Sequence, residues 1–214
     1  MPAADGPRPR LAGMSLGRLD VLLVRHAEPI ARGTPGWGER DDDRPLTEAG
    51  RLAAHELADE LEPYVITRVY SSPFLRAIET VEPTAERRGL PVTVLDGLRE
   101  RYLVTPAGDD WRDQLRAAWD DPDYAPNGAE SGRDAQRRGA AVLDLLRVRH
   151  PDGGRLLLGS HGNLISLILH TLEPGVDADF HLAMPMPAIY HLEHDGRGWR
   201  VMGGHGFVQA APRN

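Results

Sequence analysis

The amino-acid sequence predicts an α/β fold built on a parallel β-sheet. Two apolar runs, at residues 21–24 and 156–158, do not alternate with polar residues, so each is expected to form a strand buried on both faces. Segments with helical apolar spacing follow the predicted strands along the chain. This order favours parallel pairing through right-handed crossovers, which brings the carboxyl ends of the strands to one edge of the sheet, where ligands bind.

Capping residues and prolines delimit the individual elements. Thr47 is a suitable N-cap for a helix that ends at Pro63, and Pro73 stands near the start of the next helix. Ser131 would cap a long helix that ends near Arg149. The expected strands span 19–24, 65–70, 91–95 and 155–159, further helices span 74–88 and 164–172, and residues 188–193 and 199–202 alternate as an antiparallel pair.

Composition and charge restrict the class of protein. The chain has 214 residues, of which 41% are hydrophobic and 27% charged, as is usual for one globular domain. It has no apolar run long enough for a membrane span, no secretory signal and no cysteine, so we expect a cytoplasmic protein. The net charge of −7 argues against a nucleic-acid partner. We expect no membrane partner, and a homodimer is compatible with the sequence.

Three segments fall outside the regular elements. Residues 1–17 show no periodicity and predict a flexible tail that precedes a single domain at 18–214. The loop at 31–45 contains the acidic run 41–43, and residues 105–123 predict an inserted helix that could cover the site. We expect substrate specificity in these two segments, and their acidic character argues against a highly phosphorylated substrate.

Charged residues follow the predicted strands at the edge where a site is expected. Arg25 and His26 follow the first strand, His161 follows the fourth, Arg76 lies in the first turn of a helix, and Glu100 comes after the third strand. Arginine side chains suit phosphoryl oxygens, and a neutral histidine can act as a covalent nucleophile. A carboxylic acid can protonate a leaving oxygen. This set predicts phosphoryl transfer without a metal.

Four short motifs then resemble those of a known family. Leu23-Val24-Arg25-His26-Ala27-Glu28 resembles the signature of the histidine phosphatases, the phosphoglycerate mutase-like superfamily. Residues 70–80 resemble its second motif, Ser160-His161-Gly162-Asn163 its third, and Leu98-Arg99-Glu100 its acid-bearing segment. The motifs come in the family's order between residues 19 and 163. The resemblance implies a three-layer α/β/α sandwich with a mostly parallel sheet and one antiparallel edge strand, and a reaction that needs no metal or other cofactor.

The resemblance also implies a role for each matching residue. His26 would be the phosphorylated nucleophile. Arg25, Arg76 and His161 would hold the phosphoryl oxygens through the transition state. Glu100 would be the acid for the leaving alcohol and then the base for water. The implied catalytic set is thus His26, Glu100, His161, Arg25 and Arg76, and the implied phosphate-binding set is Arg25, Arg76, His161, Gly162, Asn163 and Glu28.

Departures from the family pattern leave alternatives open. Pro29 and Ile30 stand where mutases of the family usually carry a Thr and an Asn that help to grip the phosphate. Glu100 lacks the usual following Gly-x-Trp, so Glu28 or Glu130 could compete as the acid. We interpret the chain as a phosphatase that acts on a small phosphomonoester. The alternatives are a phosphoglycerate mutase-type transfer and a catalytically inactive phosphate-binding regulatory protein.

The remaining histidines carry no motif. We expect six of them to be structural or surface groups, and these are His150, His170, His181, His191, His194 and His205.

Overall fold

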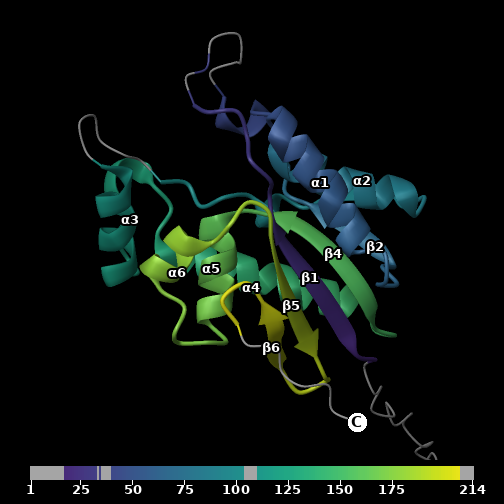
Figure 1. The fold of residues 1–214 in the computed structure, drawn as a ribbon. Helices are drawn as coiled ribbons and strands as arrows, with labels where there is room; N and C mark the ends of the chain where they lie inside the picture. The colour runs from purple at the N-terminus through teal and green to yellow at the C-terminus, as the bar shows by residue number, and fades with distance from the viewer. Residues whose placement is uncertain (1–16, 33, 35–39, 104–109, 208–214) are drawn as a thin grey trace, which may run out of the picture.

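A six-stranded mixed β-sheet forms the centre of the computed structural model, which describes residues 17–32, 34, 40–103 and 110–207 (Figure 1). The strands are β1 (Leu19–Arg25), β2 (Arg68–Ser71), β3 (Val92–Val94), β4 (Gly154–Ser160), β5 (Ala188–His194) and β6 (Trp199–Gly204). They lie in the order β3-β2-β4-β1-β5-β6. Strands β1 to β4 pair in parallel, which is the arrangement that the order of strands and helices predicts.

The C-terminal hairpin completes the sheet. Strand β5 pairs antiparallel with β1 on one side and with β6 on the other, as the alternating pattern at 188–193 and 199–202 predicts. The predicted fold class is therefore confirmed. The reversed strand, β5, lies one position in from the edge, because β6 covers its outer side.

Helices cover both faces of the sheet. They are α1 (Glu48–Glu60), α2 (Leu75–Arg87), α3 (Trp111–Asp120), α4 (Gly132–Arg149), α5 (Gly162–His170) and α6 (Ala178–Ala183). Helices α1 and α2 lie on one side of the sheet, and α3 to α6 lie on the other (Figure 1). The six-residue helix α6 was not predicted, because one and a half turns give too short a periodic pattern.

Strand β1 shows why its sequence is apolar throughout. Leu22 and Val24 belong to the hydrophobic cluster under α1 and α2. Val21 and Leu23 belong to the larger cluster under α4 and α5. All four side chains are buried, because successive residues of a strand point to opposite faces and both faces are covered. The strand is thereby fixed in register with β4, which places the residues at its carboxyl end.

Capping residues start the helices where the sequence predicts. The Thr47 hydroxyl accepts a hydrogen bond from the backbone N–H of Gly50 at 2.9 Å, and the Ser131 hydroxyl accepts one from Asp134 at 3.0 Å. Strand β2 begins at Arg68 rather than at residue 65, and Val65, which lies in the irregular segment between α1 and this strand, is largely exposed. A short 3₁₀ helix, η1 (Asp41–Asp43), forms within the loop predicted at 31–45.

Some predicted features fall outside the described residues. Residues 1–16 of the predicted tail do, whereas Gly17 donates a backbone hydrogen bond to the Pro151 carbonyl at 2.8 Å. Helix α3 lies within the predicted insertion at 105–123, and its covering of the site stays a prediction. In the described ranges no helix has both the length and the apolar character that crossing a membrane requires.

Candidate active site

The carboxyl ends of β1 and β4 bring two histidines together. Arg25 is the register partner of Ser160, so His26 and His161, the next residues on the two strands, are neighbours. The backbone N–H of His26 donates to the Ser160 carbonyl at 3.0 Å, and the two imidazole rings are 5.2 Å apart between centroids. Both side chains are buried. The prediction that the two histidines share one edge of the sheet is confirmed.

The imidazole of His26 is held by both of its nitrogen atoms. Nδ1 lies 2.7 Å from the Ala27 carbonyl oxygen, which requires a proton on Nδ1 and leaves the lone pair on Nε2. Arg76 donates from Nε to that Nε2 at 3.1 Å. The Thr80 hydroxyl accepts from the Ala27 N–H at 2.9 Å and donates to the Arg76 carbonyl at 2.6 Å, so α2 holds both neighbours of the ring. The direction of Nε2 of His26 is therefore fixed.

Burial among cations keeps both imidazoles neutral. Desolvation, together with the positive charges of Arg76 and Arg25, lowers the pKa of His26 to about 3. Desolvation also lowers the pKa of His161 well below its ordinary value, with His26 and Arg76 contributing. A neutral His26 keeps its Nε2 lone pair at physiological pH, which nucleophilic attack requires.

His161 presents a free donor toward this edge. Its Nε2 lies 2.7 Å from the Ser72 hydroxyl, which also accepts from the backbone N–H of Phe74 at 3.2 Å. A hydroxyl that accepts from Phe74 is placed to donate to His161, and the imidazole proton is then on Nδ1. That Nδ1 is buried without a hydrogen-bond partner within the described ranges. Ser72 therefore orients His161 as a donor for a ligand oxygen.

Two guanidinium groups, one buried and one partly buried, complete the cation set. Arg76 is only 2% exposed, and Arg25 donates from Nη1 to the Met184 carbonyl. The Nε of Arg25 is buried without a partner in the described part of the chain. A Cβ atom at Gly162 would lie 3.0 Å from this Nε and 2.9 Å from Cε1 of His181. Only glycine therefore allows Arg25 and His181 to approach the start of α5 this closely.

Glu100 lies at the N-terminus of α5. Its carboxylate accepts backbone hydrogen bonds from Arg101 at 2.9 Å, Leu164 at 3.1 Å and Asn163 at 3.3 Å. Its charge acts on both Arg25 and Arg76, so it faces the same cation set. A negative group is also stabilised at a helix N-terminus by the helix dipole.

The two competing carboxylates lie elsewhere. Glu28 is exposed, and its carboxylate accepts from the Thr47 hydroxyl at 3.0 Å, so the structure does not bring it into the predicted phosphate-binding set. Glu130 forms an ion pair with Arg138 at 2.7 Å. Of the three carboxylates considered as the acid, Glu100 is the one beside the strand-end residues.

Several residues at the site were not predicted. Contacts that depend on tertiary structure bring Ser72, Asp41 and Arg44 to the site. The sequence also showed no sign that His181, expected to be a structural or surface group, lies against Gly162 and Arg25. Asn163, which was predicted, is 3% exposed, and neither its amide oxygen nor its amide nitrogen has a partner within the described ranges. Buried polar atoms of this kind mark a position that a ligand can satisfy.

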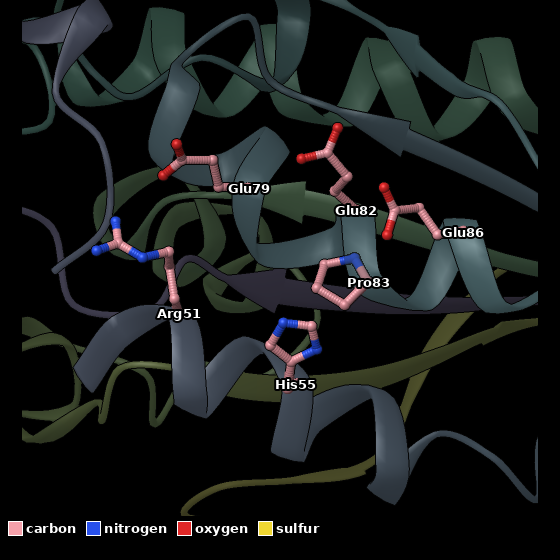
Figure 2. Close-up of a pocket in the computed structure, with 6 residues that line it drawn as sticks. All are labelled: Arg51, His55, Glu79, Glu82, Pro83 and Glu86. Atoms are coloured by element: carbon pink, nitrogen blue, oxygen red, sulfur yellow. The ribbon is translucent and has the colours of Figure 1, made fainter. Parts of the chain in front are cut away.

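A surface hollow between α1 and α2 is a separate feature. Figure 2 shows Arg51 and His55 on α1 opposite residues of α2. Its full lining is Arg51, His55, Glu79, Glu82, Pro83 and Glu86. Glu79 has a structural contact, because its carboxylate accepts from the Leu46 N–H at 2.6 Å. Neither here nor elsewhere in the described ranges do three His, Asp or Glu side chains form a group that could hold a metal ion.

Comparison with known proteins places the chain in a family. The model of the histidine phosphatase superfamily (branch 1) matches residues 21–203. A Yersinia enterocolitica protein named "Probable phosphoglycerate mutase GpmB" is 31% identical over 172 residues, which are 72% of this chain and 74% of that protein. The solved structure of Bacillus stearothermophilus YhfR is 28% identical with a TM-score of 0.70, covering 89% of this chain and 98% of that one.

A second solved structure is that of a protein named as a phosphatase. It is a mycobacterial glucosyl-3-phosphoglycerate phosphatase in complex with VO3, 27% identical with a TM-score of 0.66, covering 91% of this chain and 100% of that one. The residues that the family model matches include His26, Arg25, Arg76 and His161. The chain belongs to the histidine phosphatase superfamily, branch 1.

Proposed function

We propose that this protein is a metal-independent phosphatase that hydrolyses a small phosphomonoester through a phosphohistidine at His26. The observation that carries the proposal is the state of the His26 imidazole. The ring is neutral, its Nδ1–H donates to the Ala27 carbonyl, and its Nε2 faces Arg76. The phosphatase name of one structural neighbour supports the same reaction class.

The first step transfers the phosphoryl group to His26. The Nε–H of Arg76 leaves Nε2 of His26 and turns to a phosphoryl oxygen, which frees the Nε2 lone pair to attack phosphorus. A P–N bond forms and the P–O bond to the alcohol breaks. Arg25, Arg76 and the Nδ1 proton of His161 donate to the non-bridging phosphoryl oxygens, whose charge is stabilised best in the transition state. Protonated Glu100 gives its proton to the leaving alkoxide, which departs as the alcohol.

The second step returns the enzyme to its starting state. Ionised Glu100 takes a proton from water as the water oxygen attacks phosphorus. The P–N bond breaks, inorganic phosphate leaves, and Nε2 regains its lone pair. The proton on Nδ1 stays hydrogen-bonded to the Ala27 carbonyl throughout. His26 therefore passes through the phosphoryl-imidazolium form with no change of hydrogen-bond partner at Nδ1.

Phosphoglycerate mutase-type transfer is the second candidate. The names of curated relatives from Yersinia favour it. Pro29 and Ile30, which replace the Thr and Asn of mutases of the family, favour the phosphatase. A mutase depends on a bisphosphorylated primer and isomerises a phosphoglycerate, so primer dependence separates the two reactions.

The decisive experiment compares His26→Ala with His55→Ala, an exposed histidine of α1, in hydrolysis of an aryl phosphate with excess chelator present. We expect chelator-resistant turnover that falls by at least about a thousandfold in His26→Ala and stays near the wild-type value in His55→Ala. Turnover retained in His26→Ala contradicts the proposal. Phosphate binding without turnover in any form favours the inactive regulatory protein.

The role of Glu100 has a separate test that uses the leaving group. An aryl phosphate leaves as a phenolate that needs little protonation, whereas an alkyl phosphate needs an acid. Glu100→Gln is expected to lower kcat/KM, which reports the transfer of the phosphoryl group to His26, by about a hundredfold for the alkyl phosphate and much less for the aryl phosphate. The loss of the base for water slows the second step equally for both substrates, so the comparison uses kcat/KM and not kcat. Glu28→Gln, at the exposed competing position, is the matched control and should leave both rates near wild type. Equal losses on both substrates would contradict the assignment.

A further inference from the structure

Asp41 in η1 joins three guanidinium groups on one carboxylate. Its Oδ2 accepts from Nη2 of Arg76 at 3.2 Å, and its Oδ1 accepts from Nε of Arg44 at 2.8 Å and from Nε of Arg32 at 2.9 Å. The Asp41 carbonyl also accepts from Nη1 of Arg76 at 2.7 Å. The arrangement is that of an oxyanion bound by converging arginines, with a side chain of the protein as the anion.

The bridged cations belong to the candidate active site. The guanidinium of Arg76 donates to Nε2 of His26 through its Nε and to Asp41 through its other nitrogens. Arg44 is held from the opposite side by the Ile30 carbonyl at 2.7 Å. The charge of Arg44 contributes to the lowered pKa of His26, so it is felt at the nucleophile. An oxyanion beside His26 therefore lies within the field of both arginines.

Burial indicates which partner can leave. The side chain of Arg76 is 2% exposed and that of Arg44 is 14% exposed, whereas the Asp41 side chain is 33% exposed. A carboxylate can return to water at lower cost than two buried guanidinium groups. A phosphoryl group also has more charge and more acceptor oxygens than a carboxylate, so it is the stronger ligand for the two arginines.

The acidic run is compensated rather than free. Asp42 pairs with Arg40 at 2.5 Å, Asp43 lies 3.6 Å from the same arginine, and Asp41 is shared by three arginines. In the described part of the loop these aspartates are paired with arginines, and the expectation that the acidic segments disfavour a highly phosphorylated substrate stays a prediction. Arg44 instead offers a cation that could hold phosphate, a contact that Pro29 and Ile30 do not supply.

We infer that Asp41 occupies an anion site shared by Arg76 and Arg44, and that a phosphoryl group replaces it there, which makes Arg44 a further phosphate-binding residue of this chain. The inference rests on the proposed function for the identity of the ligand. It predicts that the Asp41 contacts and phosphate compete for the same donors.

The test measures binding of inorganic phosphate to the full chain by titration calorimetry. Asp41→Asn is expected to tighten binding by about threefold to tenfold, because the competing anion is lost. Asp42→Asn makes the same charge change one residue away, on a carboxylate paired with Arg40, and should alter binding by less than about twofold. Unchanged or weaker binding in Asp41→Asn overturns the inference.

A double-mutant cycle tests the part assigned to Arg44. Arg44→Gln should weaken phosphate binding by about tenfold. The effect should be larger in the Asp41→Asn background. In the wild-type background, loss of Arg44 also loosens the competing Asp41 carboxylate, which partly offsets the weaker binding of phosphate. Arg44→Lys keeps the charge without the guanidinium donors and should be intermediate, while Arg40→Gln is the exposed control. If Arg44→Gln has no effect in the Asp41→Asn background, Arg44 serves only Asp41 and the inference fails.

The cycle is independent of catalysis. Turnover retained in His26→Ala would remove the proposed function while leaving the phosphate affinities of the Asp41 and Arg44 variants to be judged on their own. The converse result is turnover that requires His26 together with a phosphate affinity that Asp41→Asn leaves unchanged. That result would support the proposed function and contradict this inference.

Discussion

The two ends of the central strands carry charge in opposite arrangements. At the amino end of β1, Asp20 is largely buried and meets Arg18 at 3.2 Å, Arg155 at 3.2 Å and His191 at 2.9 Å. Glu193 of β5 lies beside this group and pairs with Arg18 at 2.7 Å. Opposite charges thus compensate each other at this end.

At the carboxyl end of the same strand, two arginines lie beside two neutral rings, and the carboxylates of Glu100 and Asp41 offset their charge without satisfying every donor. Arg25 and Arg76 flank His26, and the Nε of Arg25 and the Nδ1 of His161 have no partner within the described ranges. Desolvation lowers the pKa of both arginines, which means that burial of their charge is costly. We infer that the paired charges of the amino end stabilise the fold, whereas the unpartnered donors of the carboxyl end suit an anion that binds there.

Exchanging one arginine at each end gives the largest expected contrast. Arg25→Gln should lower kcat/KM for an aryl phosphate by about a thousandfold while changing the free energy of unfolding by less than about 1 kcal/mol, since a desolvated charge is removed. Arg155→Gln, at the other end of the sheet, should leave kcat/KM within about twofold and destabilise the fold. Steady-state kinetics and denaturant unfolding of both variants check this, and equal effects of the two on activity would contradict the comparison.

Removing the central carboxylate of the amino end should act on stability alone. Asp20→Asn is expected to lower the free energy of unfolding by about 1–3 kcal/mol, because Arg155 and Arg18 then lose their shared partner. Although desolvation opposes it, the pKa of Asp20 is lowered overall by His191 and the two arginines.

The sign of the pH dependence follows from that shift. A carboxyl pKa that is lower in the folded state contributes stability above its unfolded value of 3.8, and this contribution is lost as the pH falls through the lower folded value. Acid unfolding of Asp20→Asn should therefore lack this part of the pH dependence. A wild-type acid dependence in the variant, or a loss of turnover, would count against the assigned role.

The smallest expected effect is on the titration of the nucleophile. Because the pKa of His26 is lowered to about 3 from 6.5, its ring should show no midpoint between about pH 5 and about pH 8 in NMR spectra assigned with His26→Ala. Its contribution to stability is present above 6.5 and is lost as the pH falls from there toward about 3, since only the unfolded chain takes up the proton readily. A midpoint near 6.5 would show that the site does not hold His26 neutral.

Local sequence patterns predicted the parts of the molecule that depend on periodicity and short motifs. The buried strands, the caps Thr47 and Ser131, and the convergence of His26 with His161 follow from residues close together in the chain or from the order of the elements. Helix α6 is too short for a periodic signal, so the place of His181 beside Arg25 could not be read from the sequence.

Charge pairing was the part that sequence could not supply. The run Asp41-Asp42-Asp43 looks like free negative charge, and only the folded chain brings Arg76 from α2 to Asp41. The choice among the three candidate carboxylates depended on distant partners in the same way. Glu28 contacts Thr47, Glu100 contacts the start of α5, and Glu130 pairs with Arg138. Side-chain partners that are far apart in the sequence leave no local pattern.

Direct trapping of the phosphoenzyme tests the central claim most closely. A brief incubation with a 32P-labelled phosphomonoester, quenched in alkali, is followed by peptide mapping of the wild-type protein and of His26→Ala, with His55→Ala as control. We expect an acid-labile, base-stable label on the peptide that contains His26 in the wild-type and His55→Ala proteins, and no label in His26→Ala. Turnover with no such label, or a label that persists in His26→Ala, would contradict a phosphohistidine mechanism at His26.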